Sequence, residues 1–182
     1  NIGKDVSSAQ YFQEAMKGKT FFSDIMPSPV PIENEFGELE LGLPTMFVST
    51  QVTSEKTGVL GVLVYRLDVN ELIKLIMPMK ATETGEIYLI NKDGFMLTKS
   101  RFTENLKESG IIKKRTPLEL KVANPKTGNL TLAVQQCLKG QEGYDETGYL
   151  DYRGVSVIGY WIWLPYLNWG LIAEINMDEA CN

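Results

Sequence analysis

Four glutamates lie between residues 33 and 40, after a proline-rich segment, and are the first residues whose types and spacing could do chemistry. They are Glu33, Glu35, Glu38 and Glu40. Carboxylates that alternate along an extended loop could supply the several oxygen ligands that Ca²⁺ requires. The spacing is not that of an EF-hand loop, however. It favours a solvated acidic loop, and we expect no metal site in this chain.

The chain has no histidine, and this removes most acid–base and metal chemistry. Neither a Ser-His-Asp nor a Cys-His arrangement can form, and zinc would lack imidazole ligands. The two cysteines, Cys137 and Cys181, form no metal-binding motif; they either pair in one disulfide or remain free thiols. No phosphate-binding or dinucleotide-binding glycine motif is present. We therefore expect no enzyme and no cofactor, with a hydrolase built on two carboxylates as the remaining catalytic alternative.

The composition is that of a globular protein. Its 182 residues are 43% hydrophobic and carry a net charge of −5, which suits one large domain or two small ones. The acidic balance argues against a nucleic-acid partner, because phosphate binding needs a basic face. The basic cluster at residues 113–115 favours a solvated surface. The longest apolar stretch, residues 155–169, is too short and too interrupted to cross a bilayer.

Residue patterns in the first half predict a helix followed by strands. The helix runs from Gln10 to Lys17, is capped by Ser7 or Ser8 and is stopped by Gly18. Strands are expected over residues 20–25, 44–53 and 59–67, with the last two forming a hairpin. A second helix is expected over residues 69–77.

The second half opens with a predicted hairpin. Its strands are Glu86–Asn91 and Phe95–Thr98, and its turn uses Gly94 for the positive φ. Residues 99–128 are expected to be irregular. A helix capped by Asn129 follows, then strands over residues 148–152, 155–164 and 167–176, and a final helix from Met177.

The two halves repeat the same order of elements. Residues 15–19 match residues 137–141 at the end of a helix, and residues 67–72 match residues 175–180 at a junction between a strand and a helix. This repeat predicts two related α+β modules, residues 1–80 and 81–182. The first module has no counterpart of the hairpin at residues 86–98, so we expect it to be incomplete on its N-terminal side.

Four segments resemble the Cache family, also called PDC sensor domains, in its tandem form. They are YFQEAMKGKTFFSDI (Tyr11–Ile25), GVLVYRLDVNELIKLI (Gly61–Ile76), TGEIYLINKDGFMLTKSR (Thr84–Arg101) and WGLIAEINMDEA (Trp169–Ala180). The resemblance implies an α+β fold of two PAS-like modules, each an antiparallel sheet with flanking helices, the first of them membrane-distal.

In function, this resemblance implies the extracytoplasmic, small-molecule-sensing domain of a histidine kinase, chemoreceptor or diguanylate cyclase. Such a parent protein is anchored in the plasma membrane and forms a homodimer. The ligand is expected in the distal module, and the final helix at Met177–Ala180 would pass a ligand-induced shift toward the membrane.

The family's ligand-lining places fall on the first helix, the first strand and the following hairpin. In this sequence they hold Tyr11, Phe12, Phe22, Asp24, Phe47, Ser49 and Gln51. Alternation along residues 44–53 puts Phe47, Ser49 and Gln51 on one face of the strand. That face suits a pocket lining and equally a solvent-facing sheet, and the aromatic pair Tyr11-Phe12 either closes over the ligand or belongs to the core.

The sequence departs from the family members that bind amino acids. Those members carry an arginine two residues before the aromatic pair, where this chain has Ala9, and an aspartate for the amine where it has Leu63 or Val64. The charged groups that hold an α-amino acid are therefore missing from these places. We expect a small-molecule ligand that is not an ordinary α-amino acid and is uncharged or weakly polar.

The second module has ligand-facing candidates of its own. They are Tyr88, Arg101, Tyr149, Tyr152, Arg153, Tyr160 and Trp163. Alternation along residues 155–164 favours packing on one face, and Arg153 beside Gly154 is typical of a hairpin tip. A different class of function also stays open, namely a structural or dimerisation spacer that binds a partner protein through its acidic loop and exposed aromatic residues.

Overall fold

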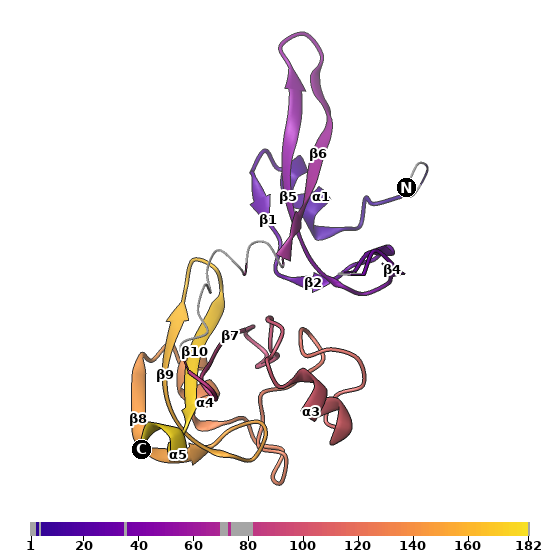
Figure 1. Cartoon of the computed structure of the whole chain (residues 1–182). Coiled ribbons are helices and arrows are strands. Elements are labelled where there is room, and N and C mark those ends of the chain that lie inside the picture. The colour runs from indigo at the N-terminus through magenta and orange to yellow at the C-terminus, as the bar shows by residue number, and fades with distance from the viewer. Residues whose placement is uncertain (1–2, 4, 35, 70–72, 74–81, 182) are drawn as a thin grey trace. The chain divides into compact units, whose positions relative to one another are not determined.

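The computed structural model describes residues 3, 5–34, 36–69, 73 and 82–181. It divides into two compact units, Asn1–Leu72 and Ile73–Asn182, which are described separately (Figure 1). The boundary expected at residues 80 and 81 lies outside the described residues. So does the helix expected over residues 69–77, apart from Val69 and Ile73.

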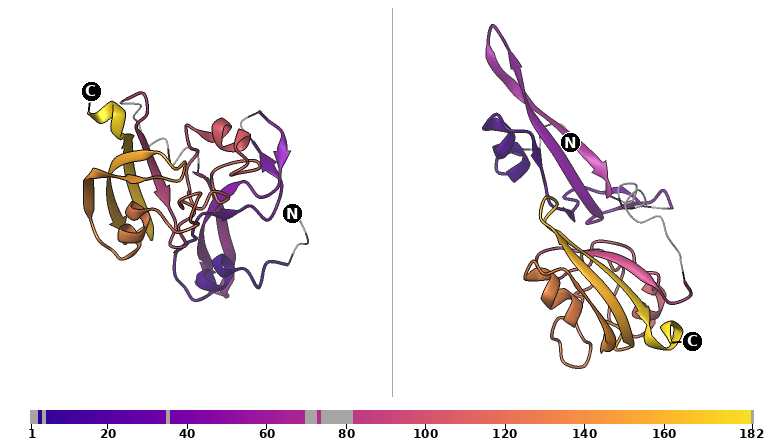
Figure 2. Two further views of the ribbon diagram at one scale, coloured as in Figure 1. Left: turned by 90° about the horizontal axis from the view of Figure 1, so that it is seen from below. Right: turned by 90° about the vertical axis from the view of Figure 1, so that its left-hand side faces the viewer.

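The first unit is built on a long hairpin of β5 (Pro44–Ser54) and β6 (Gly58–Asp68). Two short strands, β1 (Phe21–Phe22) and β2 (Met26–Pro27), pair with the other side of β5. The helix α1 (Gln10–Met16) packs on β5 and β6, and the hairpin extends past it as a two-stranded ribbon (Figure 2). The expected hairpin is confirmed, because two strands rich in β-branched residues meet across a tight turn.

The acidic loop forms a small sheet of its own. The strands β3 (Ile32–Glu33) and β4 (Leu39–Glu40) pair only with each other, and Asn34 caps the turn between them by accepting hydrogen bonds from the backbone N–H groups of Phe36 and Glu38. Glu35 lies outside the described residues. In the described part of the chain, no three acidic or cysteine side chains come together as a metal site would require.

Two local expectations in the first unit are wrong. The helix α1 begins after Ala9 without a side-chain cap, so neither Ser7 nor Ser8 caps it. The strand expected over residues 20–25 is only Phe21–Phe22, because the Ser23 hydroxyl accepts the backbone N–H of Phe47 at 2.9 Å in place of a strand carbonyl. Gly18 does end the helix, with a φ of +82°.

The second unit contains a four-stranded antiparallel sheet in the order β7-β10-β9-β8. The strands are β7 (Glu86–Ile90), β8 (Gly143–Leu150), β9 (Ser156–Leu164) and β10 (Trp169–Asn176). The helix α4 (Leu132–Leu138) packs on β8, β9 and β10, and α5 (Met177–Ala180) follows β10 directly. No helix among the described residues is long and apolar enough to cross a membrane.

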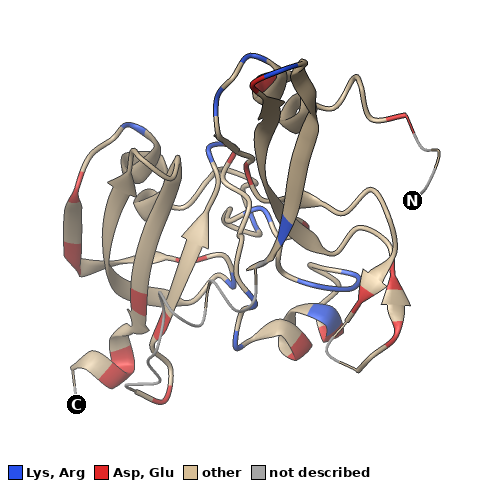
Figure 3. Ribbon diagram, turned by 90° about the horizontal axis from the view of Figure 1, so that it is seen from above, with Lys and Arg blue, Asp and Glu red and all other residues tan. Residues whose placement is uncertain are grey.

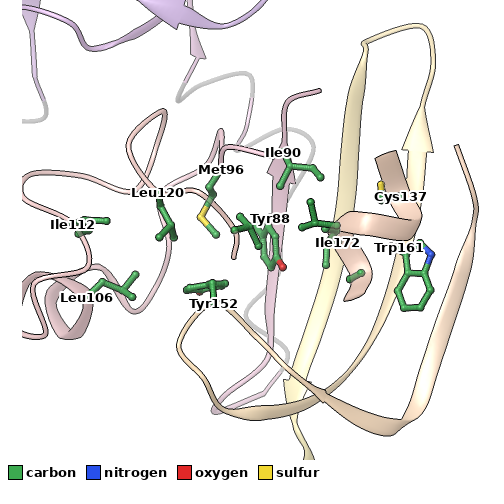
Figure 4. Close-up of a cluster of buried hydrophobic side chains, with 13 residues drawn as sticks. Tyr88, Ile90, Met96, Leu106, Ile112, Leu120, Cys137, Tyr152, Trp161 and Ile172 are labelled. Atoms are coloured by element: carbon green, nitrogen blue, oxygen red, sulfur yellow. The ribbon is translucent and has the colours of Figure 1, made fainter. Parts of the chain in front are cut away.

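The core of the second unit lies between this sheet and the segments around it (Figure 4). Trp161 is buried in this core, Trp163 packs against it and Val157 is fully buried, so the packing expected for that face of β9 is confirmed. The fully buried members are Tyr88, Ile90, Met96, Val122, Ala133, Val134, Cys137 and Ile172. Both cysteines are free, with Cys137 buried and Cys181 exposed, so no disulfide forms.

Several boundaries in the second unit differ from expectation. Phe95–Thr98 is not a strand, because successive backbone N–H groups bond to two different segments. Met96 donates to the carbonyl of Leu120, and Leu97 donates to the carbonyl of Leu89. The segment expected to be irregular contains α3 (Thr103–Glu108). The turn at Gly94 is as expected, with a φ of +78°.

Two further boundaries shift for local reasons. The helix α4 has Thr131 at its N-cap instead of Asn129, because the carbonyl of Asn129 accepts the backbone N–H of Asn124 in a turn. The strand β8 begins at Gly143, not Gly148, and ends at Leu150, where the Asp151 carboxylate accepts the backbone N–H groups of Arg153 and Val155. That carboxylate turns the chain into β9.

Candidate functional site

The α1-facing side of β5 brings four of the predicted site residues together. The Tyr11 and Phe47 rings lie 4.9 Å apart between their centroids. The Ser49 hydroxyl donates to the Tyr11 carbonyl at 2.5 Å, and the Gln51 amide donates to the Met16 carbonyl at 3.2 Å. These two polar side chains fasten the helix to the strand, and an aromatic pair lies at the junction.

The other three predicted residues lie apart from this junction. Phe22 is exposed and pairs with Val48, whose side chain is on the opposite face of β5 from Ser49. Phe21, which pairs with Ser49, takes the place on the α1 face instead. Asp24 is exposed between β1 and β2, and Phe12 is half-buried on α1. The structure therefore gathers Tyr11, Phe47, Ser49 and Gln51 and leaves Phe12, Phe22 and Asp24 outside.

The pairing register adds a residue that the sequence analysis missed. Arg66 of β6 pairs with Phe47, and Val64 pairs with Ser49. Paired residues of antiparallel strands point to the same face, so Arg66 shares the face that carries the Tyr11–Phe47 pair. Arg66 is exposed, and no hydrogen bond or ion pair joins it to the side chains that the structure describes, among which that of Asp68 is not included. The alternation of β6 could have shown this residue only once the register of the hairpin was known.

A surface cavity of about 560 Å³ lies in the equivalent part of the second unit. Its lining residues are Leu132, Gln136, Gln141, Glu142, Asp145 and Trp161. Its two carboxylates are already engaged, since Glu142 accepts the Tyr160 hydroxyl and Asp145 accepts the backbone N–H groups of Thr147 and Gly148. These hydrogen bonds lower the pKa of Asp145, that from Gly148 most strongly.

Trp161 occupies the position in the second unit that Ser49 has in the first. In the first unit Thr45 pairs with Asp68 at the end of the hairpin, and in the second Val157 pairs with Asn176 before α5. Four residues further along each strand lie Ser49 and Trp161. The indole ring is buried and packs in the core, so it fills space beneath α4 that a serine would leave open.

A network of tyrosines and carboxylates lies inside the second unit, and the predicted candidates Tyr88, Tyr149 and Tyr152 belong to it. Glu174 of β10 is 6% exposed and accepts the Tyr88 hydroxyl at 3.0 Å and the Tyr149 hydroxyl at 2.8 Å. Glu86 pairs with Glu174 across the strands and accepts the Tyr152 hydroxyl. Burial raises the pKa of Glu174 to about 7, although both tyrosine hydroxyls oppose the shift. Burial also raises the pKa of each tyrosine, and the nearby carboxylates add to it.

Arg153 also points inward, although it stands at a hairpin tip. Its guanidinium contacts Asp151 at 2.6 Å and Asn176 at 2.7 Å, and it lies 3.8 Å above the Phe102 ring. Asp151 is fully buried, so this ion pair is a structural one. Arg153 is therefore not available to a ligand.

The carboxylate of Glu179 in α5 joins the last helix of the second unit to residues 83 and 84, which precede β7. It accepts the backbone N–H of Glu83 at 2.9 Å and that of Thr84 at 2.7 Å, and it also accepts the Thr84 hydroxyl. The same hydroxyl accepts the backbone N–H of Asn176 at 3.2 Å, and Arg101 binds the carbonyls of Thr82 and Gly85 nearby. We call residues 82–85 with residues 176–179 the entry–exit corner. The hydrogen bonds from Thr84 lower the pKa of Glu179.

Comparison with known proteins relates the chain to sensor domains by structure alone. No known protein family and no curated protein matches its sequence. The extracellular domain of the putative histidine kinase vpHK1S-Z8 superposes with a TM-score of 0.61 at 18% identity, over 98% of this chain and 58% of that one. The ligand-binding domain of Mlp24 with asparagine gives 0.57 at 14% identity, over 98% and 60%.

A third solved structure gives the same result. The periplasmic sensory domain of the Campylobacter jejuni chemoreceptor Tlp1 superposes with a TM-score of 0.52 at 18% identity, over 97% of this chain and 58% of that one. The chain thus spans about three fifths of the length of these relatives. Its α+β fold of two antiparallel sheets with helices matches about 60% of such a sensor domain, as expected for tandem modules of which one is partial. The chain therefore has the tandem Cache fold of the extracytoplasmic sensor domains of histidine kinases and chemoreceptors.

Proposed function

We propose that this chain is the ligand-sensing part of a transmembrane signalling receptor, exposed outside the cytoplasm, and that it binds a small molecule without transforming it. The ligand site would lie in the first unit, on the face of β5 and β6 that carries Tyr11, Phe47 and Arg66. The observation that supports this most directly is Arg66, an exposed arginine on the same face as an aromatic pair. The solved relatives include receptors whose names state an amino-acid ligand.

The residues on this face favour a ligand with an anionic group. A guanidinium binds carboxylates and phosphates through two parallel hydrogen bonds. An anionic ligand replaces the uncharged or weakly polar one expected from the sequence, because Arg66 was not placed on this face there. Toward the hairpin turn, Ser49 and Val64 on this face carry no carboxylate, whereas in the other direction Asp68 pairs with Thr45 two residues beyond Arg66. The prediction that an ordinary α-amino acid does not bind rests on Ala9, Leu63 and Val64, which stand where the amino-acid-binding members carry charged residues.

The signal would leave through β10 and α5. That strand ends at the entry–exit corner, where Glu179 holds the chain that enters the second unit. A ligand that favours one position of the entering chain would therefore act on α5 through these hydrogen bonds. The parent receptor would be a membrane-anchored homodimer, as the resemblance to the family implies.

Binding can be tested with a variant that leaves the fold intact. Native mass spectrometry of the purified chain would reveal a co-purified ligand, and thermal-shift and calorimetric titrations would then compare organic mono- and dicarboxylates with α-amino acids. We expect a carboxylate to bind and the substitution Arg66→Ala to weaken it about tenfold or more, since hydrogen bonds to charged groups contribute about 1.5–3 kcal/mol. Lys56→Ala, in the exposed turn of the same hairpin, is the matched control.

Each outcome has a definite meaning. Binding that survives Arg66→Ala unchanged would place the ligand elsewhere. Binding of an ordinary α-amino acid would contradict the ligand class. A bare chain in the mass spectrum, together with no response to the panel, would favour the spacer function, for which the exposed apolar surface of β6 is the supporting observation.

A further inference from the structure

The indole N–H of Trp161 is a buried donor that the packing of the second unit does not satisfy. Trp161 is 5% exposed, and its Nε1 is buried with no hydrogen-bond partner among the described residues. Most buried N–H groups are bonded, because a donor that leaves water without a replacement acceptor costs free energy. Trp161 is also the most deeply buried residue of the surface cavity, whose other lining residues come from α4, β8 and the turn between them. An acceptor bound in that cavity would satisfy the donor.

Gly143 allows the indole to extend toward the cavity. It pairs with Trp161 across β8 and β9, so the two residues share one face of the sheet. A Cβ on Gly143 would lie 3.1 Å from Cζ2 and 3.3 Å from Nε1 of the indole. The nitrogen edge of the ring therefore lies over β8, the outermost strand of the sheet, and Figure 4 shows the nitrogen on the side of the ring away from Ile172. That side is where the cavity lies, between β8 and α4.

Two carboxylates line the same cavity, and each has one oxygen that no described residue binds. Oε1 of Glu142 accepts the Tyr160 hydroxyl, and Oδ1 of Asp145 accepts backbone N–H groups, so Oε2 and Oδ2 remain. The Lys139 ammonium donates to the Gln136 side chain at 3.4 Å, and no ion pair joins it to either carboxylate. β8 itself carries acidic residues and no basic one (Figure 3). The cavity is therefore acidic on one side and has an indole donor at its base.

We propose that this cavity is a second binding site, which takes a small organic cation that also carries a carbonyl or hydroxyl oxygen. The carboxylates of Glu142 and Asp145 would hold its ammonium or guanidinium group, and its oxygen would accept the Trp161 N–H. The amides of Gln136 and Gln141 can donate or accept, so they suit the rest of such a molecule. A volume of about 560 Å³ is within the range of small-molecule sites.

The charge of the lining separates this site from the one proposed in the first unit. A free carboxylate on the bound molecule would be repelled by the two acidic side chains, so the site favours an amide or an alcohol over an acid. The face that carries Arg66 is proposed to bind an anion. All lining residues of the cavity lie between residues 132 and 161, within the second unit. The two proposals therefore stand or fail separately.

The indole N–H gives a direct readout of binding. The chain has three tryptophans and hence three indole signals in a ¹H–¹⁵N spectrum, and that of Trp161 is assigned by its through-space contacts to Gly143. Titration with argininamide should move this signal downfield to saturation, while the signals of Trp163 and Trp169 stay in place. Acetamide keeps the carbonyl but lacks the cation, and arginine adds a carboxylate. Both should bind at least about tenfold more weakly than argininamide, because charge-assisted hydrogen bonds are the stronger ones.

Matched variants test the roles of the individual residues. Glu142→Gln keeps an acceptor for the Tyr160 hydroxyl but removes the charge, so it should weaken argininamide binding about tenfold or more at an unchanged melting temperature. Glu146→Gln, at an exposed position of β8 outside the cavity lining, is the control. Gly143→Ala places a methyl group against the nitrogen edge of the indole and should abolish the shift of the Trp161 signal.

Three results would overturn the proposal. A Trp161 signal that does not move at about 10 mM argininamide, about tenfold above a millimolar Kd, would show that the cavity binds no such cation. Equal affinities for argininamide, arginine and acetamide would contradict the proposed ligand charge. Binding that Glu142→Gln leaves unchanged would place the cation elsewhere. Arg66→Ala should alter none of these measurements, so a failure here is distinguishable from a failure of the site in the first unit.

Discussion

Glu174 should make the stability of the second unit fall as the pH rises through neutrality. This carboxylate is buried in β10, and its two hydrogen-bond partners are neutral tyrosine hydroxyls from β7 and β8. The other charged groups around it are Glu86 on β7 and the Asp151–Arg153 pair that follows β8. Because Arg153 binds Asp151, Glu174 receives no ion pair from the residues that the structure describes. Its pKa rises from the ordinary value of 4.5 to about 7, mainly because burial penalises the charged form.

The sign of the effect follows from proton binding. The folded state holds the Glu174 proton more tightly than the unfolded state, so this group stabilises the fold fully below about pH 4.5 and loses that contribution as the pH rises to about 7. A pKa difference between 4.5 and about 7 corresponds to about 3 kcal/mol, at 1.36 kcal/mol per pH unit. Glu174→Gln keeps the size and the hydrogen-bonding capacity of the side chain but removes the titration.

Urea unfolding followed by tryptophan fluorescence is the suitable assay. All three tryptophans, Trp161, Trp163 and Trp169, lie in the second unit and report its unfolding. At pH 8 the variant should be more stable than the parent by up to about 3 kcal/mol, and at pH 5 the difference should fall to about 1 kcal/mol or less. Parallel pH curves for the two proteins would refute the reasoning. So would a parent that gains stability, relative to the variant, between pH 5 and pH 8.

Three further predictions concern the packing of the second unit. Gly94→Ala should lower the free energy of unfolding by about 2 kcal/mol, because the residue has a φ of +78° and a Cβ would lie 2.8 Å from Leu130. Gly110→Ala is the control: it also has a positive φ but no neighbour within 4 Å of a Cβ, so it measures the cost of the backbone conformation alone. Arg153→Ala should cost about 3–5 kcal/mol in urea unfolding, since it leaves Asp151 buried without its partner, and an effect below about 1 kcal/mol would show that water reaches that carboxylate. Burial raises the pKa of Cys137 to about 11, so a thiol reagent at pH 8 should modify one cysteine in the folded chain and both after denaturation.

Much of the fold could be predicted because periodicity and glycine positions determine it locally. The β5–β6 hairpin, the Gly94 turn and the order of elements after α4 all follow from short-range patterns. The errors occur where a side chain replaces a backbone partner, as Ser23 does at the end of β1. The site could be predicted only in part. The alternation of residues along β5 shows which of its side chains share a face, but Arg66 is placed on that face only by the pairing register between β5 and β6.

Glu174 was missed for a related reason. A single acid within the apolar strand at residues 169–176 marks a buried carboxylate, but its partners come from two other strands far away in sequence. The sequence analysis names Tyr88, Tyr149 and Tyr152 as possible ligand contacts of the second module. Their hydroxyl groups instead satisfy buried carboxylates, which is a three-dimensional requirement that no local pattern reveals.

The entry–exit corner has a consequence for how such receptors can be rebuilt. Glu179 and Thr84 hold residues 82–85 and 176–179 at one place. On the proposed function, a signal that passes through this corner would not need a rearrangement of the tyrosine-rich interior. The interior residues could then be replaced by those of another protein without loss of the signal, provided that the unit stays folded. A hybrid receptor that keeps residues 82–85 and 176–179 but takes the rest of the unit from another protein should still respond to its stimulus. The transferable part of this module is then its corner and not its core.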